Sequence, residues 1–206
     1  MEKFTRITAI AAPLLRINID TDAIIPSREM KTVGKTGLAA GLFAGWRYQA
    51  PGSREEDPAF VLNREPYRKA RILLAGANFG CGSSREHAVW ALQEWGMRAI
   101  IAPSYGAIFA GNCVRNGILP VVLDNAVVED LARQVEADPA SRLLTVDLVA
   151  CTVLAPDGQR HGFAIPAADR EMLLEGLDGI ALTMKRDDEI LAFQGRDRLR
   201  RPWIYL

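Results

Sequence analysis

The sequence predicts an α/β domain in which parallel strands alternate with helices. Between residues 71 and 137, short apolar runs of strand length alternate with segments whose apolar residues recur at helical spacing. The order strand, helix, strand, helix, strand favours parallel pairing through right-handed crossovers. The last third instead contains a partly alternating segment, an Asp157-Gly158 turn and a return strand, which is typical of a β-hairpin.

The expected elements follow from these periodicities in chain order. Residues 4–15 are interpreted as one strand with its exit, because apolar residues occupy alternate positions. A polar turn at 18–22 leads into a short apolar run, and residues 35–45 are glycine-rich and form a loose helix. Residues 50–58 form a loop, and Ser104 caps a helix. Further strands are expected at 72–75, 98–102, 119–123, 144–154 and 161–165, and helices at 84–95, 104–115, 126–137, 167–176 and 186–194.

Composition limits the class of protein. The 206 residues suffice for one domain, residues 1–206, with an irregular segment at about 17–66. Lys+Arg and Asp+Glu both number 25, so no net charge attracts nucleic acid or an anionic membrane. No apolar run is long enough to span a bilayer, and the N-terminus opens no signal peptide. With three widely spaced cysteines, these features predict a cytoplasmic protein that binds neither nucleic acid nor membrane.

The segment from Gly76 to His87 carries the chemistry. It joins a buried strand to a helix N-terminus, where glycines allow tight turns and close approach to a ligand. The first amides of a helix have no partner within the helix, and with the helix dipole they attract a carboxylate or phosphate. Arg85 adds a cation that can hold a carboxylate through two hydrogen bonds. The segment is therefore a candidate anion-binding site.

Three other interpretations compete for this segment. Residues 83–86 fit a capping box, with Ser83 bonding forward and Glu86 bonding back. If Ser84 is the cap instead, the Ser83 hydroxyl is free, and the pattern does not decide between the two. A nucleotide loop fits poorly, because no Gly-Lys-Ser/Thr occurs and Arg85 stands where a third glycine belongs. A reactive Cys81 would need a base, and neither histidine has a sequence reason to be one.

The same segment also carries a resemblance to a known family. Residues 78–88, Asn-Phe-Gly-Cys-Gly-Ser-Ser-Arg-Glu-His-Ala, are similar to the signature of the 3-isopropylmalate dehydratase small subunits, the counterpart of the mobile C-terminal domain of aconitase. The resemblance covers nearly the whole chain. Shorter matches occur in the family's order at residues 18–26, 35–38, 60–63, 112–120 and 176–183.

This resemblance implies a fold, a reaction and a partner. The fold is a swivelling β/β/α domain. The reaction is a hydro-lyase isomerisation of 2-isopropylmalate and 3-isopropylmalate in leucine biosynthesis, by dehydration and rehydration of a hydroxy-diacid. The enzyme is active only when this chain pairs with a large subunit, as a heterodimer or a larger assembly. The large subunit carries the 4Fe–4S cluster that takes the hydroxyl group, and this chain binds no cofactor.

The resemblance also implies roles for individual residues. Ser83 is the base that removes the proton next to a carboxylate, and Arg85 binds a substrate carboxylate. The remaining substrate-binding candidates are Ser84, Asp22 and Arg28, with Asp22 orienting neighbouring groups. Glu29 and Met30 belong to the loop that contacts the variable part of the substrate.

Two departures from the family bear on the substrate. Glu29-Met30 stands where an aromatic residue and a leucine are common, and residues 104–113 differ from the usual run. An isopropyl group gains about 1.5–3 kcal/mol from burial. An unpaired carboxylate facing it is costly to desolvate. Either Glu29 points away, or the substrate is another 2-alkylmalate such as citramalate.

A metal site in this chain is not expected. Cluster sites place two cysteines close together, whereas 31 and 37 residues separate the three cysteines here. Two other functions remain open. One is a free-standing anion- or nucleotide-binding domain, which would bind its ligand without a partner. The other is a paralogue that pairs with a large subunit but has lost activity.

Overall fold

The computed structural model describes residues 1–30, 34–83 and 85–205. It contains a parallel sheet with strand order β2-β3-β4-β5 and an antiparallel sheet with strand order β1-β6-β7-β8, which confirms the α/β class. The strands are β1 (Arg6–Ala9), β2 (Ala11–Leu14), β3 (Ile72–Ala75), β4 (Ala99–Ala102), β5 (Leu119–Val122), β6 (Leu144–Asp147), β7 (Thr152–Leu154) and β8 (Arg160–Gly162). The helices are α1 (Thr21–Ile24), α2 (Ala44–Arg47), α3 (Glu86–Trp95), α4 (Ala107–Arg115), α5 (Asn125–Ala137), α6 (Ala167–Glu175), α7 (Gly179–Met184) and α8 (Asp187–Arg200), with short 3-10 turns η1 (Ser27–Glu29), η2 (Ala39–Gly41), η3 (Val61–Asn63), η4 (Tyr67–Lys69) and η5 (Pro202–Ile204).

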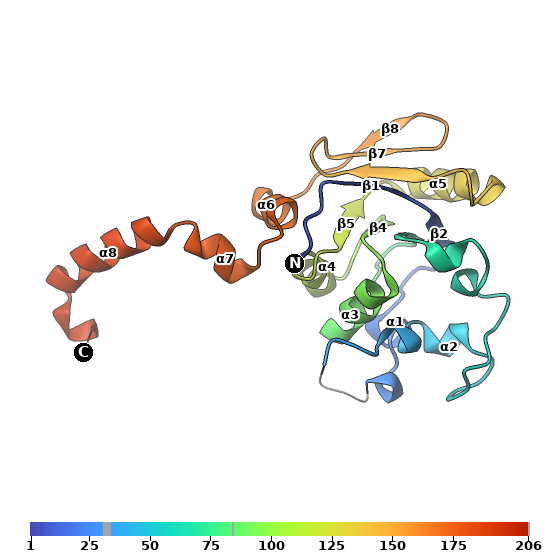
Figure 1. Cartoon of the computed structure of the whole chain (residues 1–206), viewed down its shortest axis with the longest axis horizontal. Coiled ribbons are helices and arrows are strands. Elements are labelled where there is room, and N and C mark those ends of the chain that lie inside the picture. Colours follow the sequence, from blue (N-terminus) through green and yellow to red (C-terminus); the bar gives the residue numbers. More distant parts are fainter. Residues whose placement is uncertain (31–33, 84, 206) are drawn as a thin grey trace.

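The parallel sheet is the middle layer of the fold. Successive side chains of a strand point to opposite faces, so β3 contributes to two cores. Leu73 packs with Leu92 of α3 in one cluster, whereas Leu74 packs with Val146 of β6 in the other. Figure 1 shows β1, β7 and β8 on one side of this sheet and α1 and α3 on the other. The layers therefore run antiparallel sheet, parallel sheet, helices, which is the expected β/β/α order.

The N-terminal strand predicted at 4–15 is two strands, one in each sheet. β1 pairs antiparallel with β6, and β2 pairs parallel with β3. Between them, the carbonyl of Ile10 accepts hydrogen bonds from the amides of Arg71 (3.1 Å) and Ile72 (3.3 Å). The prediction of a single strand was wrong because alternation of apolar residues does not show where a chain leaves one sheet for another.

The crossover prediction is confirmed in β3, α3, β4, α4 and β5. Leu73 lies opposite Ile100, and Ile100 lies opposite Pro120, in parallel register. The carboxyl ends of β3 and β4 therefore open on one edge of the sheet, the usual ligand position in such folds. The turns that follow are joined there, because the amide of Phe79 donates to the Ser104 carbonyl at 3.0 Å and Phe79 pairs with Tyr105 in a β-bridge.

Several predicted boundaries differ from the structure. Ser104 does not cap α4, because the N-cap of this helix is Gly106. The Ser104 hydroxyl oxygen instead accepts a hydrogen bond from the Asn78 amide at 2.8 Å. The loose helix expected at 35–45 is η2 followed by α2. The strand expected at 144–154 is β6 and β7, joined by a turn, and β8 returns antiparallel to β7 as the hairpin prediction requires.

The C-terminal helices lie apart from the site-forming edge. Figure 1 shows α7 and α8 extending away from the two sheets. Their apolar side chains include the exposed Ile180 and Leu199, and Trp203 follows in η5. No helix in the described part of the chain is long and apolar enough to cross a bilayer. This arm does not position the candidate site.

Candidate active site

The start of α3 decides which serine side chain is free. Arg85 is the N-cap, with extended backbone angles and no side-chain cap bond, and Glu86 is the first helical residue. The capping box is therefore wrong, since Glu86 would have to be the third helical residue. Its carboxylate instead accepts a hydrogen bond from Asn116 Nδ2 at 3.1 Å. Ser84 lies outside the described residues, so its predicted role stays a prediction.

Ser83 is exposed and held by its backbone. Its carbonyl accepts a hydrogen bond from Thr21 Oγ1 at 2.6 Å, and Thr21 is only 2% exposed. The Ser83 hydroxyl makes no hydrogen bond to any other residue within 1–30, 34–83 and 85–205. The fixed backbone and the uncommitted hydroxyl leave Ser83 free to face a ligand.

Arg85 forms an ion pair with Asp22 across the site. Arg85 Nη1 contacts Asp22 Oδ1, and the side chains are 24% and 56% exposed respectively. Asp22 is positioned by α1, whose N-cap Asp20 accepts a hydrogen bond from the Ala23 amide at 2.7 Å. An arginine has five N–H donors, so one contact with Asp22 leaves others for a ligand.

Backbone hydrogen bonds hold the turn at 18–22 against the turn at 77–83. The Asn18 amide donates to the Ala77 carbonyl at 2.9 Å, and the Gly80 amide donates to the Ile19 carbonyl at 2.7 Å. A side-chain bond from Asn78 Nδ2 to Asn18 Oδ1 at 2.8 Å adds to them. Sequence reasoning missed Thr21, Asn18 and Asn78, although the polar run at 18–22 was the available signal.

Arg28, Glu29 and Met30 form a second group, and none of their described contacts joins them to Arg85. Arg28 Nε lies 3.6 Å from Glu29 Oε1. The Glu29 side chain is only 7% exposed and pairs with Arg54 at 2.7 Å. Met30 packs against the core on the α3 side of the parallel sheet. Glu29 therefore is not an unpaired carboxylate, and sequence reasoning missed the counter-charge at Arg54.

The cysteines do not gather into a metal site. The described residues contain no group of three or more His, Cys, Asp or Glu side chains that could hold a metal ion. Cys113 is fully buried, and burial raises the pKa of its thiol well above the usual range. Cys81 and Cys151 are half-buried free thiols. That the enzyme uses an iron–sulfur cluster, and that the large subunit holds it, both stay predictions.

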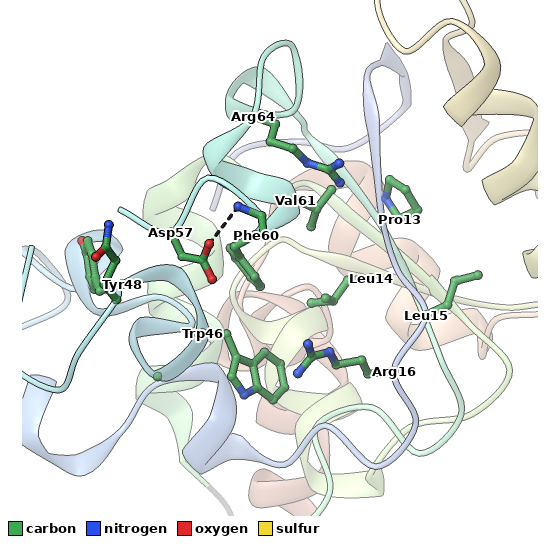
Figure 2. A pocket seen from close by; sticks show the side chains of 13 residues that line it. Pro13, Leu14, Leu15, Arg16, Trp46, Tyr48, Asp57, Phe60, Val61 and Arg64 are labelled. Carbon is green, nitrogen blue, oxygen red and sulfur yellow. Dashed lines mark hydrogen bonds between the residues drawn. The ribbon is translucent and has the colours of Figure 1, made fainter. Parts of the chain in front are cut away.

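A cavity of about 670 Å³ lies beside the site, not over it. Figure 2 shows Arg64 and Arg16 approaching it from opposite sides, with Phe60 and Leu14 between them. The Arg16 guanidinium lies 4.5 Å from the centre of the Trp46 ring. A Cβ on Gly76 would lie 2.5 Å from the Arg16 carbonyl oxygen, so this wall of the cavity touches the start of the site-forming turn.

Glu94 fixes the turn that leads into η2. Its carboxylate accepts hydrogen bonds from three successive amides, those of Gly37 (2.6 Å), Leu38 (2.5 Å) and Ala39 (2.8 Å). An acidic residue in the last turn of α3 is unfavourable toward the helix dipole, and these amides offset that cost. Partial burial would raise the pKa of Glu94, but the amides outweigh it and hold the pKa below its ordinary value.

We expect Glu94→Gln to destabilise the chain by about 1 kcal/mol at neutral pH, which is below the usual range for hydrogen bonds to charged groups because Glu94 is exposed to solvent. A lowered folded-state pKa stabilises the protein above the unfolded pKa of about 4.3 and loses that effect as pH falls through the folded pKa. The difference between wild type and variant in urea unfolding should therefore shrink below about pH 4. A difference that stays constant from pH 7 to pH 3 contradicts the role of the charge.

Family models match most of the chain. One described as the aconitase C-terminal domain matches residues 1–126, and one described as LeuD_N matches residues 129–167. The chain is 65% identical over 205 residues to the 3-isopropylmalate dehydratase small subunit of Cupriavidus necator, covering 100% of this chain and 99% of that protein. The chain belongs to the 3-isopropylmalate dehydratase small-subunit family.

Other similar proteins agree with this assignment. The 3-isopropylmalate dehydratase small subunit of Rhodospirillum centenum is 50% identical over 203 residues, with 98% of each chain covered. The solved structure of a 3-isopropylmalate dehydratase (LeuD) from Methanocaldococcus jannaschii covers 93% of this chain and 99% of its own, with a TM-score of 0.63 and 24% identity. That likeness shows the fold alone. The family predicted from residues 78–88 is confirmed, while the roles of the site residues stay predictions.

Proposed function

We propose that this chain is the small subunit of a hydro-lyase that interconverts 2-isopropylmalate and 3-isopropylmalate by removing and re-adding water, in leucine biosynthesis. The observation that carries the proposal is that Arg85 and an exposed Ser83 both lie immediately before α3, in a chain 65% identical over its whole length to a small subunit of that enzyme. We also propose that it works in the cytoplasm, where its three free cysteines stay reduced.

Ser83 and Arg85 divide the work of the proposed reaction. Arg85 binds a substrate carboxylate through the donors that Asp22 leaves free. Ser83, acting as its alkoxide, removes the proton next to that carboxylate and becomes the neutral hydroxyl, and charge accumulates on the carboxylate as the proton leaves. The first amides of α3 and the Arg85 cation, which the fold holds next to Ser83 before substrate binds, stabilise this charge. When bound to the large subunit, the 4Fe–4S cluster supplies the Lewis acid that accepts the hydroxyl group.

Asp22 acts on Arg85 in this scheme and does not transfer a proton. Its carboxylate holds the guanidinium in one orientation, which reduces the entropy lost when substrate binds. A substrate carboxylate must fit beside Asp22, since two carboxylates compete for the same cation. We therefore assign Asp22 a positioning role.

The decisive experiment is an anaerobic dehydration assay of this chain with a cluster-loaded large subunit from the same source. The proposal predicts turnover of 2-isopropylmalate by the pair and none by either chain alone. Faster turnover of citramalate would correct the substrate and keep the reaction class. Formation of the pair without turnover of either substrate would indicate a paralogue that has lost activity. Tight ligand binding by the isolated chain would favour a free-standing anion-binding domain.

We propose further that the cavity beside the site receives an acidic part of the large subunit. The large subunit must cover Ser83 and Arg85 to bring its cluster to the substrate, and the cavity adjoins their turn through Gly76. Within the described part of the chain, neither Arg16 nor Arg64 has an ion-pair partner, and Asp57 is the one acidic residue lining the cavity. Arginine beside a half-buried tryptophan, as Arg16 lies beside Trp46, is typical of residues that dominate binding at interfaces.

Charge reversal tests this surface. We expect Arg64→Glu to raise the Kd of the two chains by about 10-fold or more, and more strongly at low salt, because it places a negative charge opposite an acidic partner. The matched control is Arg142→Glu, an exposed arginine on the antiparallel-sheet side of the chain. Sedimentation of the pair at two salt concentrations measures the effect. Equal Kd values for the two variants would exclude this cavity from the interface.

A further inference from the structure

The Glu29 side chain points into the protein, where it forms an ion pair with Arg54 from a distant segment of the chain. Its side chain is 7% exposed, and Oε2 lies 2.7 Å from Arg54 Nη2. Arg28 Nε, the other cation near this carboxylate, lies farther away at 3.6 Å. Arg54 belongs to the loop that sequence reasoning placed at 50–58. The ion pair therefore ties that loop to the segment 26–30.

Gly41 provides the space that this arrangement needs. A Cβ at position 41 would lie 2.6 Å from Glu29 Cβ and 3.4 Å from Ile25 Cδ1. Real Cβ contacts do not approach 3.0 Å, so any side chain at position 41 would displace Glu29. Glycine is required here for the absence of a side chain, since its φ is not positive.

The turn beneath Glu29 is held from both sides. The amides of this turn donate hydrogen bonds to Glu94. The carbonyls of the turn accept hydrogen bonds from arginine and tyrosine side chains. Arg54 Nη1 donates to the Ala40 carbonyl at 3.1 Å, and the Tyr48 hydroxyl donates to the same oxygen at 2.8 Å. Arg47 Nη1 donates to the Ala39 carbonyl at 2.8 Å. Arg54 thus bridges Glu29 and a turn that is itself fixed.

We infer that Arg54 is a positioning residue for substrate specificity. It holds the Glu29 carboxylate against Gly41, so that the alkyl group of the substrate meets Met30 and not a carboxylate. The inference rests on the proposed function, and on the contact with the variable part of the substrate that the family resemblance implies for Glu29 and Met30. Without Arg54, Glu29 would be an almost buried charge without its nearest counter-ion, which is costly. The segment would then move to bring this carboxylate to water and would withdraw Met30.

The test compares Arg54→Met with wild type in the assembled enzyme. The expected result is a rise of about 10-fold in KM for 2-isopropylmalate with kcat changed less than about 2-fold, because substrate binding is lost and the reacting groups stay in place. Citramalate carries a methyl group in place of isopropyl, so its KM should rise less. Adding Glu29→Gln to Arg54→Met removes the carboxylate charge that has lost Arg54, and should return the KM for 2-isopropylmalate most of the way to the wild-type value.

A second measurement does not depend on activity. Trypsin cleavage after the exposed Arg28 should be at least about 10-fold faster in Arg54→Met, since cleavage requires local opening of the segment. The double variant with Glu29→Gln should be cleaved at nearly the wild-type rate. The control is Arg68→Met, which removes a similar ion pair with Glu56 that does not touch segment 26–30.

The outcomes separate this inference from the proposed function. Equal cleavage rates of Arg54→Met and Arg68→Met would overturn the inference, whatever the activity. Faster cleavage with the same KM change for both substrates would also overturn it, because the held segment would not set alkyl preference. Absence of turnover in the wild-type pair would overturn the proposed function, and with it the specificity role of Arg54.

Discussion

Replacement of Ser83 by alanine is expected to lower turnover of 2-isopropylmalate by about 10²–10⁴-fold in the assembled enzyme, the usual contribution of a general base. The hydroxyl is exposed and is not the cap of α3, so its loss removes a reacting group without breaking a described hydrogen bond. Because Thr21 holds the Ser83 carbonyl, the backbone should keep its position in the variant. Complex formation and thermal unfolding should therefore stay unchanged.

The kinetic pattern distinguishes a base from a binding residue. Loss of a group that acts in the transition state lowers kcat and kcat/KM together, whereas loss of uniform binding raises KM alone. We expect the first pattern for Ser83→Ala. The matched control is Ser141→Ala, an exposed serine on the antiparallel-sheet side of the chain, which should keep near-wild-type kcat. A Ser83→Ala enzyme with more than a tenth of wild-type kcat would show that another group removes the proton.

Replacement of Gly80 by alanine is expected to destabilise the chain by about 3 kcal/mol or more, and to disrupt the site with the fold. Gly80 has φ +71°, where a Cβ costs about 1–2 kcal/mol. A Cβ there would also lie 2.1 Å from the Phe109 ring, which packs edge-on against Phe79 at 5.4 Å. Moving Phe109 disturbs the core under both site-forming turns and costs a further 1–3 kcal/mol, roughly.

Gly96→Ala separates the two costs of this substitution. Gly96 ends α3 at φ +108°, but a Cβ there meets nothing within 4 Å. Only the backbone cost of the positive φ remains, about 1–2 kcal/mol. Urea unfolding of both variants measures the difference. Equal destabilisation would mean that Phe109 moves aside at little cost and that the close approach at Gly80 does not hold the turn.

Much of the fold was predictable because local patterns encode it. The strand at 72–75 and the helix at 126–137 lie within one residue of β3 and α5, since buried strands and amphipathic helices leave a clear periodicity. The family, too, followed from the contiguous run at 78–88. The start of α3 did not, because the capping pattern at Ser83 fits a helix two residues longer than the one that forms.

The sequence by itself thus determined the order of strands and helices from β3 to α5, the family, and the presence of Ser83 and Arg85 at a helix start. Only the tertiary structure decided what surrounds them. It assigned residues 6–9 and 11–14 to different sheets, paired Asp22 with Arg85, and gave Glu29 its counter-ion in Arg54. These partners lie far apart along the chain, and no local periodicity or capping signal records which distant charges meet when the sheets and helices pack.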